Sequence, residues 1–223
     1  MTALIVLHDI GDEGGGAPWR NAFLAAGWQG TVIAPDLPGH AGAPPPEGGN
    51  HEPGDAAYVL VALLAKMPEE QPVVVGIGAN GWAAELAALA ARATVVVLVD
   101  GTGAPWATPA ELVRSQRDRL RALAADEVAL APSPPGAALD PRLRHGLPRH
   151  GSRRLAMRAA AALPVPLVVV ETPAGPTPTQ DAAALVAACP AGGRVVIVGD
   201  ATPSAVASAV LTALDPQQEP KAG

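Results

Sequence analysis

The chain has 223 residues, of which 49% are hydrophobic and only 3% aromatic, so it is long enough for one domain with a mainly aliphatic core. A net charge of −6 at pH 7 argues against general nucleic-acid binding. No apolar run reaches the roughly 18 residues of a membrane span. The N-terminus lacks the basic segment of a secretory signal, and Cys189 has no cysteine to pair with. We therefore expect a soluble cytoplasmic protein that binds neither nucleic acid nor membrane.

Short runs rich in β-branched residues alternate with Ala/Leu-rich stretches, which is the pattern of βαβ units. The expected strands are Leu4–His8, Thr31–Ala34, Pro72–Ile77, Thr94–Val99, Pro166–Glu171 and Arg194–Val198. The expected crossover helices are Pro18–Ala26, Asp55–Lys66, Gly81–Ala91, Thr179–Ala188 and Pro203–Leu214. The strands are almost wholly apolar, as in sheets covered on both faces. We predict an α/β fold with a doubly wound, mostly parallel sheet of about six strands, formed by residues 1–101 and 164–215.

Residues 102–163 interrupt this rhythm. They contain an expected helix at Pro109–Ala125, a Pro/Gly-rich segment at Ala131–Gly151 and a second helix near Ser152–Ala162. An excursion of this length inside a compact domain usually has a function, so we interpret it as a helical and irregular lid insert. It carries ten Arg and five acidic residues, which leaves −11 for the rest of the chain. Residues 216–223 are expected to be a flexible tail.

Three segments in order carry a resemblance that covers essentially the whole chain. The loop Asp9-Ile10-Gly11 follows the first strand as an HG-x-G oxyanion loop would, and the segment from Ala34 to His40 matches APDLPGHG. The segment from Val73 to Trp82 is similar to the nucleophile elbow VGHSMGGW. The chain therefore resembles the α/β-hydrolase superfamily of esterases and lipases, in a minimal form without the two N-terminal antiparallel strands.

The resemblance also implies where a Ser-His-Asp triad would stand. The nucleophile position is Gly78, the acid position is Gly175, and the histidine position falls at or next to Thr202. No histidine follows His150. The sequence thus predicts a divergent member that lacks the triad, because these side chains work as a unit. The alternative is that Gly78 belongs to an ordinary Gly-rich turn and the serine lies elsewhere.

An oxyanion hole is made of backbone N–H groups, so it does not depend on the three side chains of the triad. The resemblance implies oxyanion-hole N–H groups at Ile10 and Ala79, which can stabilise an enolate or a polarised carbonyl. Asp9, beside this hole, is a candidate general base or acid, the alternative being a carboxylate that caps a turn. The neighbouring Asp12 and Glu13 come without His or Cys at metal-ligand spacing, so we expect no metal and no cofactor.

The insert supplies the other candidates. Between Pro141 and Arg158 it has six Arg and two His but no acidic residue. Arg144 and Arg149 could bind an anionic ligand, or the arginines could pair with acids of the body and latch the lid shut. His145 and His150 are candidate proton-transfer groups. Two tryptophans could line an apolar pocket, with plain packing as the alternative: Trp82 and Trp106.

Three functions remain open from the sequence. The first is a non-hydrolytic enzyme of the cyclase, lyase or decarboxylase type, acting on a small carbonyl-bearing molecule in secondary metabolism through the oxyanion hole and without a covalent intermediate. The second is an inactive pseudohydrolase that binds a ligand or partner. The third is a hydrolase with unconventional catalytic residues. A small-molecule ligand is the expected partner, and a homodimer is left open.

Overall fold

The fold is built on one six-stranded parallel sheet. The computed structural model describes residues 2–47, 51–52, 54–68, 70–90, 92–101, 109–131, 133–146, 153–175 and 179–215. The strands are β1 (Leu4–Leu7), β2 (Val32–Ile33), β3 (Val73–Ile77), β4 (Val95–Val99), β5 (Leu167–Glu171) and β6 (Gly193–Ile197). Their order across the sheet is β2-β1-β3-β4-β5-β6, and every neighbouring pair is parallel. This confirms the predicted doubly wound α/β fold.

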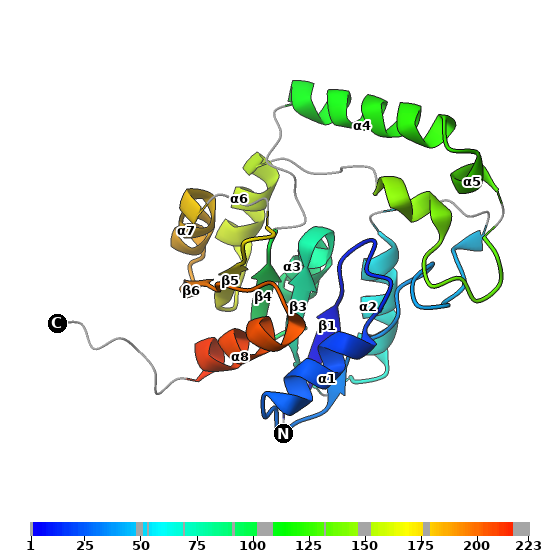
Figure 1. Cartoon of the computed structure of the whole chain (residues 1–223). Helices are drawn as coiled ribbons and strands as arrows, with labels where there is room; N and C mark the ends of the chain where they lie inside the picture. The colour runs from blue at the N-terminus through cyan, green and yellow to red at the C-terminus, as the bar shows by residue number, and fades with distance from the viewer. Residues whose placement is uncertain are drawn as a thin grey trace.

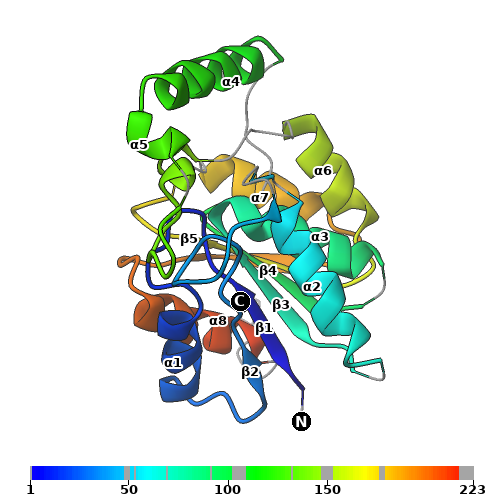
Figure 2. The ribbon, with the colours of Figure 1, turned by 90° about the vertical axis from the view of Figure 1, so that its right-hand side faces the viewer.

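Helices cover both faces of the sheet (Figures 1 and 2). On one face lie α1 (Ala17–Ala25) and α8 (Pro203–Leu214). The other face is covered by α2 (Asp55–Ala65), α3 (Gly81–Leu89), α6 (Arg153–Ala162) and α7 (Thr179–Ala188). This two-sided cover explains the continuous apolar runs, because alternate side chains of each strand enter different core layers.

The two core layers can be followed along single strands. In β4, Val96 and Leu98 join the cluster under α2, α3, α6 and α7, whereas Val97 and Val99 join the cluster under α1 and α8. All four side chains are at most 1% exposed. A polar side chain within these strands would have no water to bond, so polar chemistry is restricted to the strand ends.

The segment between β4 and β5 holds three further elements: α4 (Pro109–Ala124), α5 (Glu127–Leu130) and the 3-10 helix η3 (Pro141–His145). Helix α4 stands away from the sheet in both views (Figures 1 and 2). The sequence predicts only irregular chain around η3 and does not predict α5. Each begins at an aspartate that accepts backbone N–H bonds, Asp126 for α5 and Asp140 for η3.

Helix α6 behaves differently from the rest of this segment. Its Ala156 and Ala160 are at most 1% exposed and belong to the core cluster with α3 and α7. It therefore packs as part of the helical layer, although the sequence analysis placed its residues in the insert. Within the described residues, no helix is both long and apolar enough to cross a bilayer. The predicted tail, 216–223, lies outside the described residues.

Candidate active site

The carboxylate of Asp9 lies at the carboxyl end of the sheet, in the loop after β1. Its Oδ1 accepts hydrogen bonds from the N–H of Ile10 at 2.8 Å and from the N–H of Ala79 at 3.0 Å. These are the two donors that the sequence analysis assigned to an oxyanion hole. The structure directs both toward the same anionic oxygen, while Oδ2 accepts no hydrogen bond from the described residues.

Gly78 makes room for this carboxylate. It follows β3 with a φ of +53°, in the left-handed region that glycine adopts without strain. A Cβ built at this position would lie 2.2 Å from Cγ, Oδ1 and Oδ2 of Asp9. The Asp9 carboxylate thus fills the space that a side chain on the elbow would need, and the two side chains exclude one another.

Electrostatics make Asp9 a candidate for proton transfer. Burial raises the pKa of its carboxyl group, and the hydrogen bonds from Ala79 and Ile10 offset part of that rise. Its side chain is only half-buried, so water or a small ligand can reach it. A carboxylate whose pKa is raised is a stronger base than an ordinary surface carboxylate.

Two buried histidines support the loop that carries Asp9. The Nδ1–H of His8 donates to the Asp9 carbonyl at 2.9 Å, and Nε2 of His8 accepts from the N–H of Leu37 at 3.1 Å. His40 accepts from the N–H of Gly11 at 3.0 Å and donates to the Pro38 carbonyl at 3.1 Å. Burial lowers the pKa of both rings, so they are neutral supports whose nitrogens are all engaged.

Gly175, which the resemblance predicts as the acid position, lies against a carboxylate that follows a neighbouring strand. A Cβ on Gly175 would lie 2.3 Å from Oδ1 of Asp100, which directly follows β4 and has a φ of +54°. The N–H and the hydroxyl of Thr172 donate to the Asp100 carboxylate at 2.6 Å each. Asp100 therefore ties β4 to the loop after β5.

Thr202, at or next to the predicted histidine position, is the N-cap of helix α8. Its hydroxyl accepts from the N–H of Ala205 at 3.4 Å and donates to Asp200 at 3.0 Å. This is the geometry of an exposed N-cap.

The other predicted site residues lie on α3 and in the segment between β4 and β5. His145 pairs with Asp126 at 2.8 Å, Arg144 is exposed, and Trp82 is half-buried on α3. Trp106, Arg149 and His150 lie outside the described residues. Among the described residues, no three His, Cys, Asp or Glu side chains are grouped as metal ligands.

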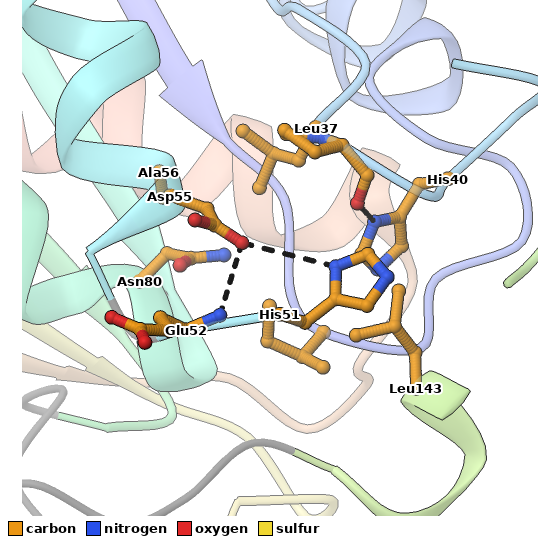
Figure 3. Close-up of a pocket in the computed structure, with 10 residues that line it drawn as sticks. Leu37, His40, His51, Glu52, Asp55, Ala56, Asn80 and Leu143 are labelled. Carbon is orange, nitrogen blue, oxygen red and sulfur yellow. Dashed lines mark hydrogen bonds and ion pairs between the residues drawn. The ribbon is translucent and has the colours of Figure 1, made fainter. Parts of the chain in front are cut away.

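A small hollow adjoins the loop after β1, and its space of about 10 Å³ is enough for one water molecule (Figure 3). Its lining includes Ile10 and Asn80 from the two sides of the elbow, together with His51. The full lining is Ile10, Leu37, Pro38, His40, His51, Glu52, Asp55, Ala56, Asn80 and Leu143. The sequence predicts no role for His51, because its nearer carboxylate partner, Asp140, comes from a distant segment and no local motif surrounds it.

His51 is held between two carboxylates. Its Nε2 lies 3.2 Å from Oδ2 of Asp140, and its Nδ1 lies 3.8 Å from Oδ2 of Asp55. Its side chain is 3% exposed. Arg142 donates two hydrogen bonds to the Asp140 carboxylate, from Nε to Oδ1 at 2.9 Å and from Nη2 to Oδ2 at 2.6 Å. This arginine of the insert is therefore paired within the insert.

Comparison with known proteins agrees with this architecture. The family model described as "Alpha/beta hydrolase family" matches residues 4–218. The chain belongs to the alpha/beta hydrolase family. No curated protein matches it significantly.

Solved structures of this fold are similar along nearly the whole chain. An esterase from Thermogutta terrifontis is 17% identical with a TM-score of 0.69, over 95% of this chain and 88% of that one. NosK from Streptomyces actuosus is 21% identical with a TM-score of 0.60, over 96% and 99%. An enol-lactonase from Burkholderia xenovorans LB400 is 16% identical with a TM-score of 0.64, over 96% and 91%. At these identities the likeness shows the alpha/beta hydrolase fold alone.

Proposed function

We propose that this alpha/beta hydrolase-fold chain has lost the serine triad and is a non-hydrolytic enzyme that moves a proton next to the carbonyl group of a small molecule. The observation that supports this most directly is the Asp9 carboxylate, seated over Gly78 on the N–H groups of Ile10 and Ala79. The arrangement combines a base with a pair of donors for a developing oxyanion.

The proposed step begins when the carbonyl oxygen of the ligand replaces Oδ1 of Asp9 between the two N–H groups. The released carboxylate then takes the proton from the carbon next to the carbonyl. The C–H electron pair forms the carbon–carbon double bond of an enolate, whose oxygen stays on the N–H groups of Ile10 and Ala79. Each donor of this kind contributes roughly 3–4 kcal/mol to a transition state.

No covalent adduct is needed for this chemistry. An enolate can eliminate a leaving group, close a ring or take back a proton, so reactions of the lyase and cyclase types fit it. A decarboxylase would form the same enolate by loss of CO₂ from a β-keto acid, and would need only the two N–H donors. Position 78 offers no oxygen for attack, and Thr202, at the expected histidine position, caps a helix. A serine acyl intermediate therefore has no place in the proposal.

Deuterium exchange tests this proposal without a known substrate. Butan-2-one is incubated in D₂O with the protein, and loss of the signals of its α-protons is followed by proton NMR. We expect catalysed exchange that is lost in Asp9→Asn and retained in Glu13→Gln, a matched change at an exposed residue of the same loop. Exchange no faster than in buffer, or exchange that survives Asp9→Asn, refutes the proposal.

A second candidate is a pseudohydrolase that binds a ligand or partner without turnover. One observation favours it: Oδ1 of Asp9 already satisfies both N–H groups, so a ligand carbonyl must displace a hydrogen-bonded carboxylate. The same NMR samples separate the two functions, because a pure binding protein broadens or shifts the ketone signals without exchanging the α-protons.

A further inference from the structure

Strand β6 stands at the outer edge of the sheet, between helices α7 and α8 (Figure 1). Within the described residues it pairs with β5 alone. The edges of a sheet hold N–H and C=O groups that can bond a further strand, and proteins commonly protect them with proline, lysine or a very short strand. β6 contains no proline or lysine, and it has five residues, whereas the strand at the other edge, β2, has two. β6 is therefore the edge that can accept a further strand.

The backbone of β6 directs alternate residues toward the open side. The Gly192 carbonyl accepts a hydrogen bond from β5 at 3.1 Å, and the Val198 N–H donates to β5 at 2.8 Å. The N–H and C=O groups of one peptide point in opposite directions, so the Gly193 N–H and the Ile197 C=O point away from β5. The alternation of a parallel ladder adds the N–H and C=O groups of Val195. These three residues hold the donors and acceptors for one more strand.

This pattern is self-complementary about Val195. When two β6 strands pair antiparallel about a two-fold axis at Val195, this residue lies opposite its own copy and Gly193 lies opposite Ile197. Each pair exchanges both of its backbone hydrogen bonds, because these residues have the outward groups. The side chain of Ile197 is 71% exposed. A Cβ on Gly193 would lie 2.0 Å from a carbonyl oxygen of β5, so this position stays bare and leaves space for Ile197 of the other copy.

The surroundings of this edge carry little charge. Helices α7 and α8 contact β6 from opposite faces of the sheet. α8 has no charged residue, and the one charged residue of α7, Asp181, is 5% exposed. In β6 the charged residue is Arg194, which in this pairing lies opposite Val196 and not opposite its own copy. Two chains that each carry a net charge of −6 can thus meet here without like charges in contact.

The helices enlarge the contact beyond the two strands. A stable interface buries about 800 Å² on each partner, which a pair of five-residue strands alone does not supply. Adjacent strands lie about 4.8 Å apart, so a helix that covers β5 and β6 comes to lie about 10 Å from its copy, which is the distance of packed helices. α7 contacts both of these strands, and its exposed side chains Ala183 and Ala187 are small enough for a second α7 to approach.

We propose that β6 is the interface of a homodimer, in which antiparallel pairing centred on Val195 joins the sheets of two copies into one continuous sheet. The partner is a second copy of this chain, because β6 supplies both halves of the match, the exposed Ile197 and the bare Gly193. Strands β3, β4 and β5 separate β6 from β1 and the Asp9 loop. The dimer therefore does not depend on the proposed function.

Size-exclusion chromatography with light scattering tests the dimer on the full chain. At micromolar concentrations we expect the wild type to have twice the 22.3 kDa mass of one chain. Ile197→Lys places a charge against Gly193 of the other copy, and we expect it to raise the dissociation constant of the dimer by about 100-fold. Val195→Pro removes the outward N–H at the centre and leaves the hydrogen bonds to β5, so we expect it to weaken the dimer as well. Val61→Lys, at a valine of α2 that is 64% exposed, is the matched control and should remain a dimer.

Hydrogen exchange gives a second readout that needs no variant. The amides of Gly193, Val195 and Ile197 should exchange more slowly as the protein concentration rises through the dissociation constant. A wild type that stays monomeric refutes the interface, as does a dimer that survives Ile197→Lys or that is lost equally in Val61→Lys. A dimer whose β6 amides exchange at the same rate at every concentration would also refute it, because another surface would then join the two copies.

Discussion

The carboxylate of Asp9 and a side chain at Gly78 compete for the same space. All three carboxyl atoms of Asp9 lie 2.2 Å from the place where a Cβ on residue 78 would stand. A side chain at residue 78 therefore fits only if the Asp9 carboxylate moves away, whereas Gly78 leaves that carboxylate in place.

This exclusion predicts a strong coupling between the two positions. Gly78→Ala is expected to lower the free energy of unfolding by about 1–3 kcal/mol for the left-handed backbone, plus the cost of displacing Asp9. Gly27→Ala is the matched control, because its φ is +102° but nothing lies within 4 Å of the added Cβ. Urea unfolding should show that Asp9→Ala recovers part of the loss at position 78 and none of the loss at position 27. Additive effects at 9 and 78 would contradict the exclusion.

The raised pKa of Asp9 predicts that this residue lowers the free energy of unfolding more at neutral pH than in acid. Because burial raises the folded-state pKa above the ordinary 3.8, the folded chain keeps this proton to a higher pH than the unfolded chain does. The contribution of Asp9 to stability is thus fully present below pH 3.8 and is lost as the pH rises through the folded-state pKa. Unfolding experiments should show Asp9→Asn gaining stability relative to the wild type as the pH rises from 4 to 7. If the difference in free energy of unfolding between Asp9→Asn and the wild type stays constant from pH 4 to 7, the pKa of Asp9 is not raised in the folded chain.

Asp140 predicts the opposite pH dependence. Its folded-state pKa of about 2 is depressed, so its contribution is present above the ordinary 3.8 and is lost as the pH falls toward 2. At pH 7 we expect Asp140→Asn to cost about 2–3 kcal/mol in free energy of unfolding, since it weakens charged hydrogen bonds to Arg142.

The control for Asp140 is a pair on the surface. Asp118→Asn removes an exposed partner 3.7 Å from Arg121 and should cost less than about 1 kcal/mol. The lowered pKa of Asp140 is contradicted if the two variants lose the same free energy of unfolding at pH 7. It is also contradicted if the loss in Asp140→Asn does not become smaller as the pH falls toward 2.

The absence of a serine at the elbow predicts inertness toward serine-hydrolase reagents. A fluorophosphonate probe needs a hydroxyl activated by a neighbouring base, and Gly78 has none. Intact-mass spectrometry after incubation should show the unmodified chain, with a serine esterase labelled in the same tube as the positive control. Stoichiometric labelling of any serine would revive the reading of this chain as a hydrolase.

Much of the fold could be predicted because the apolar pattern is local. Helices Thr179–Ala188 and Pro203–Leu214 have the predicted bounds, and the six strands differ from prediction by a residue or two at their ends. Helix α5 and η3 were missed although Asp126 and Asp140 are usable cap residues, since a cap signal before four or five residues inside a Pro/Gly-rich segment is weak.

The site was predicted only as far as the resemblance reached. The elbow at Gly78 and the loop at Ile10 follow directly from sequence segments, and Asp9 was singled out from its place in that loop. The position of the Asp9 carboxylate over Gly78 depends on β1 and β3 being neighbours in the sheet. A local sequence pattern does not show which strands are neighbours. The contact between His51 and Asp140 depends on the pairing of residues 39–42 with 137–140, and sequence periodicity cannot show such a contact.

The most direct test of the account is a crystal structure with acetylacetone, a stable mimic of an enolate. We predict that one oxygen of the ligand lies between the N–H groups of Ile10 and Ala79, with the Asp9 carboxylate displaced from them and facing the carbon between the two carbonyl groups. A ligand bound elsewhere while Asp9 keeps both N–H groups, or a ligand bonded covalently to the protein, would contradict it.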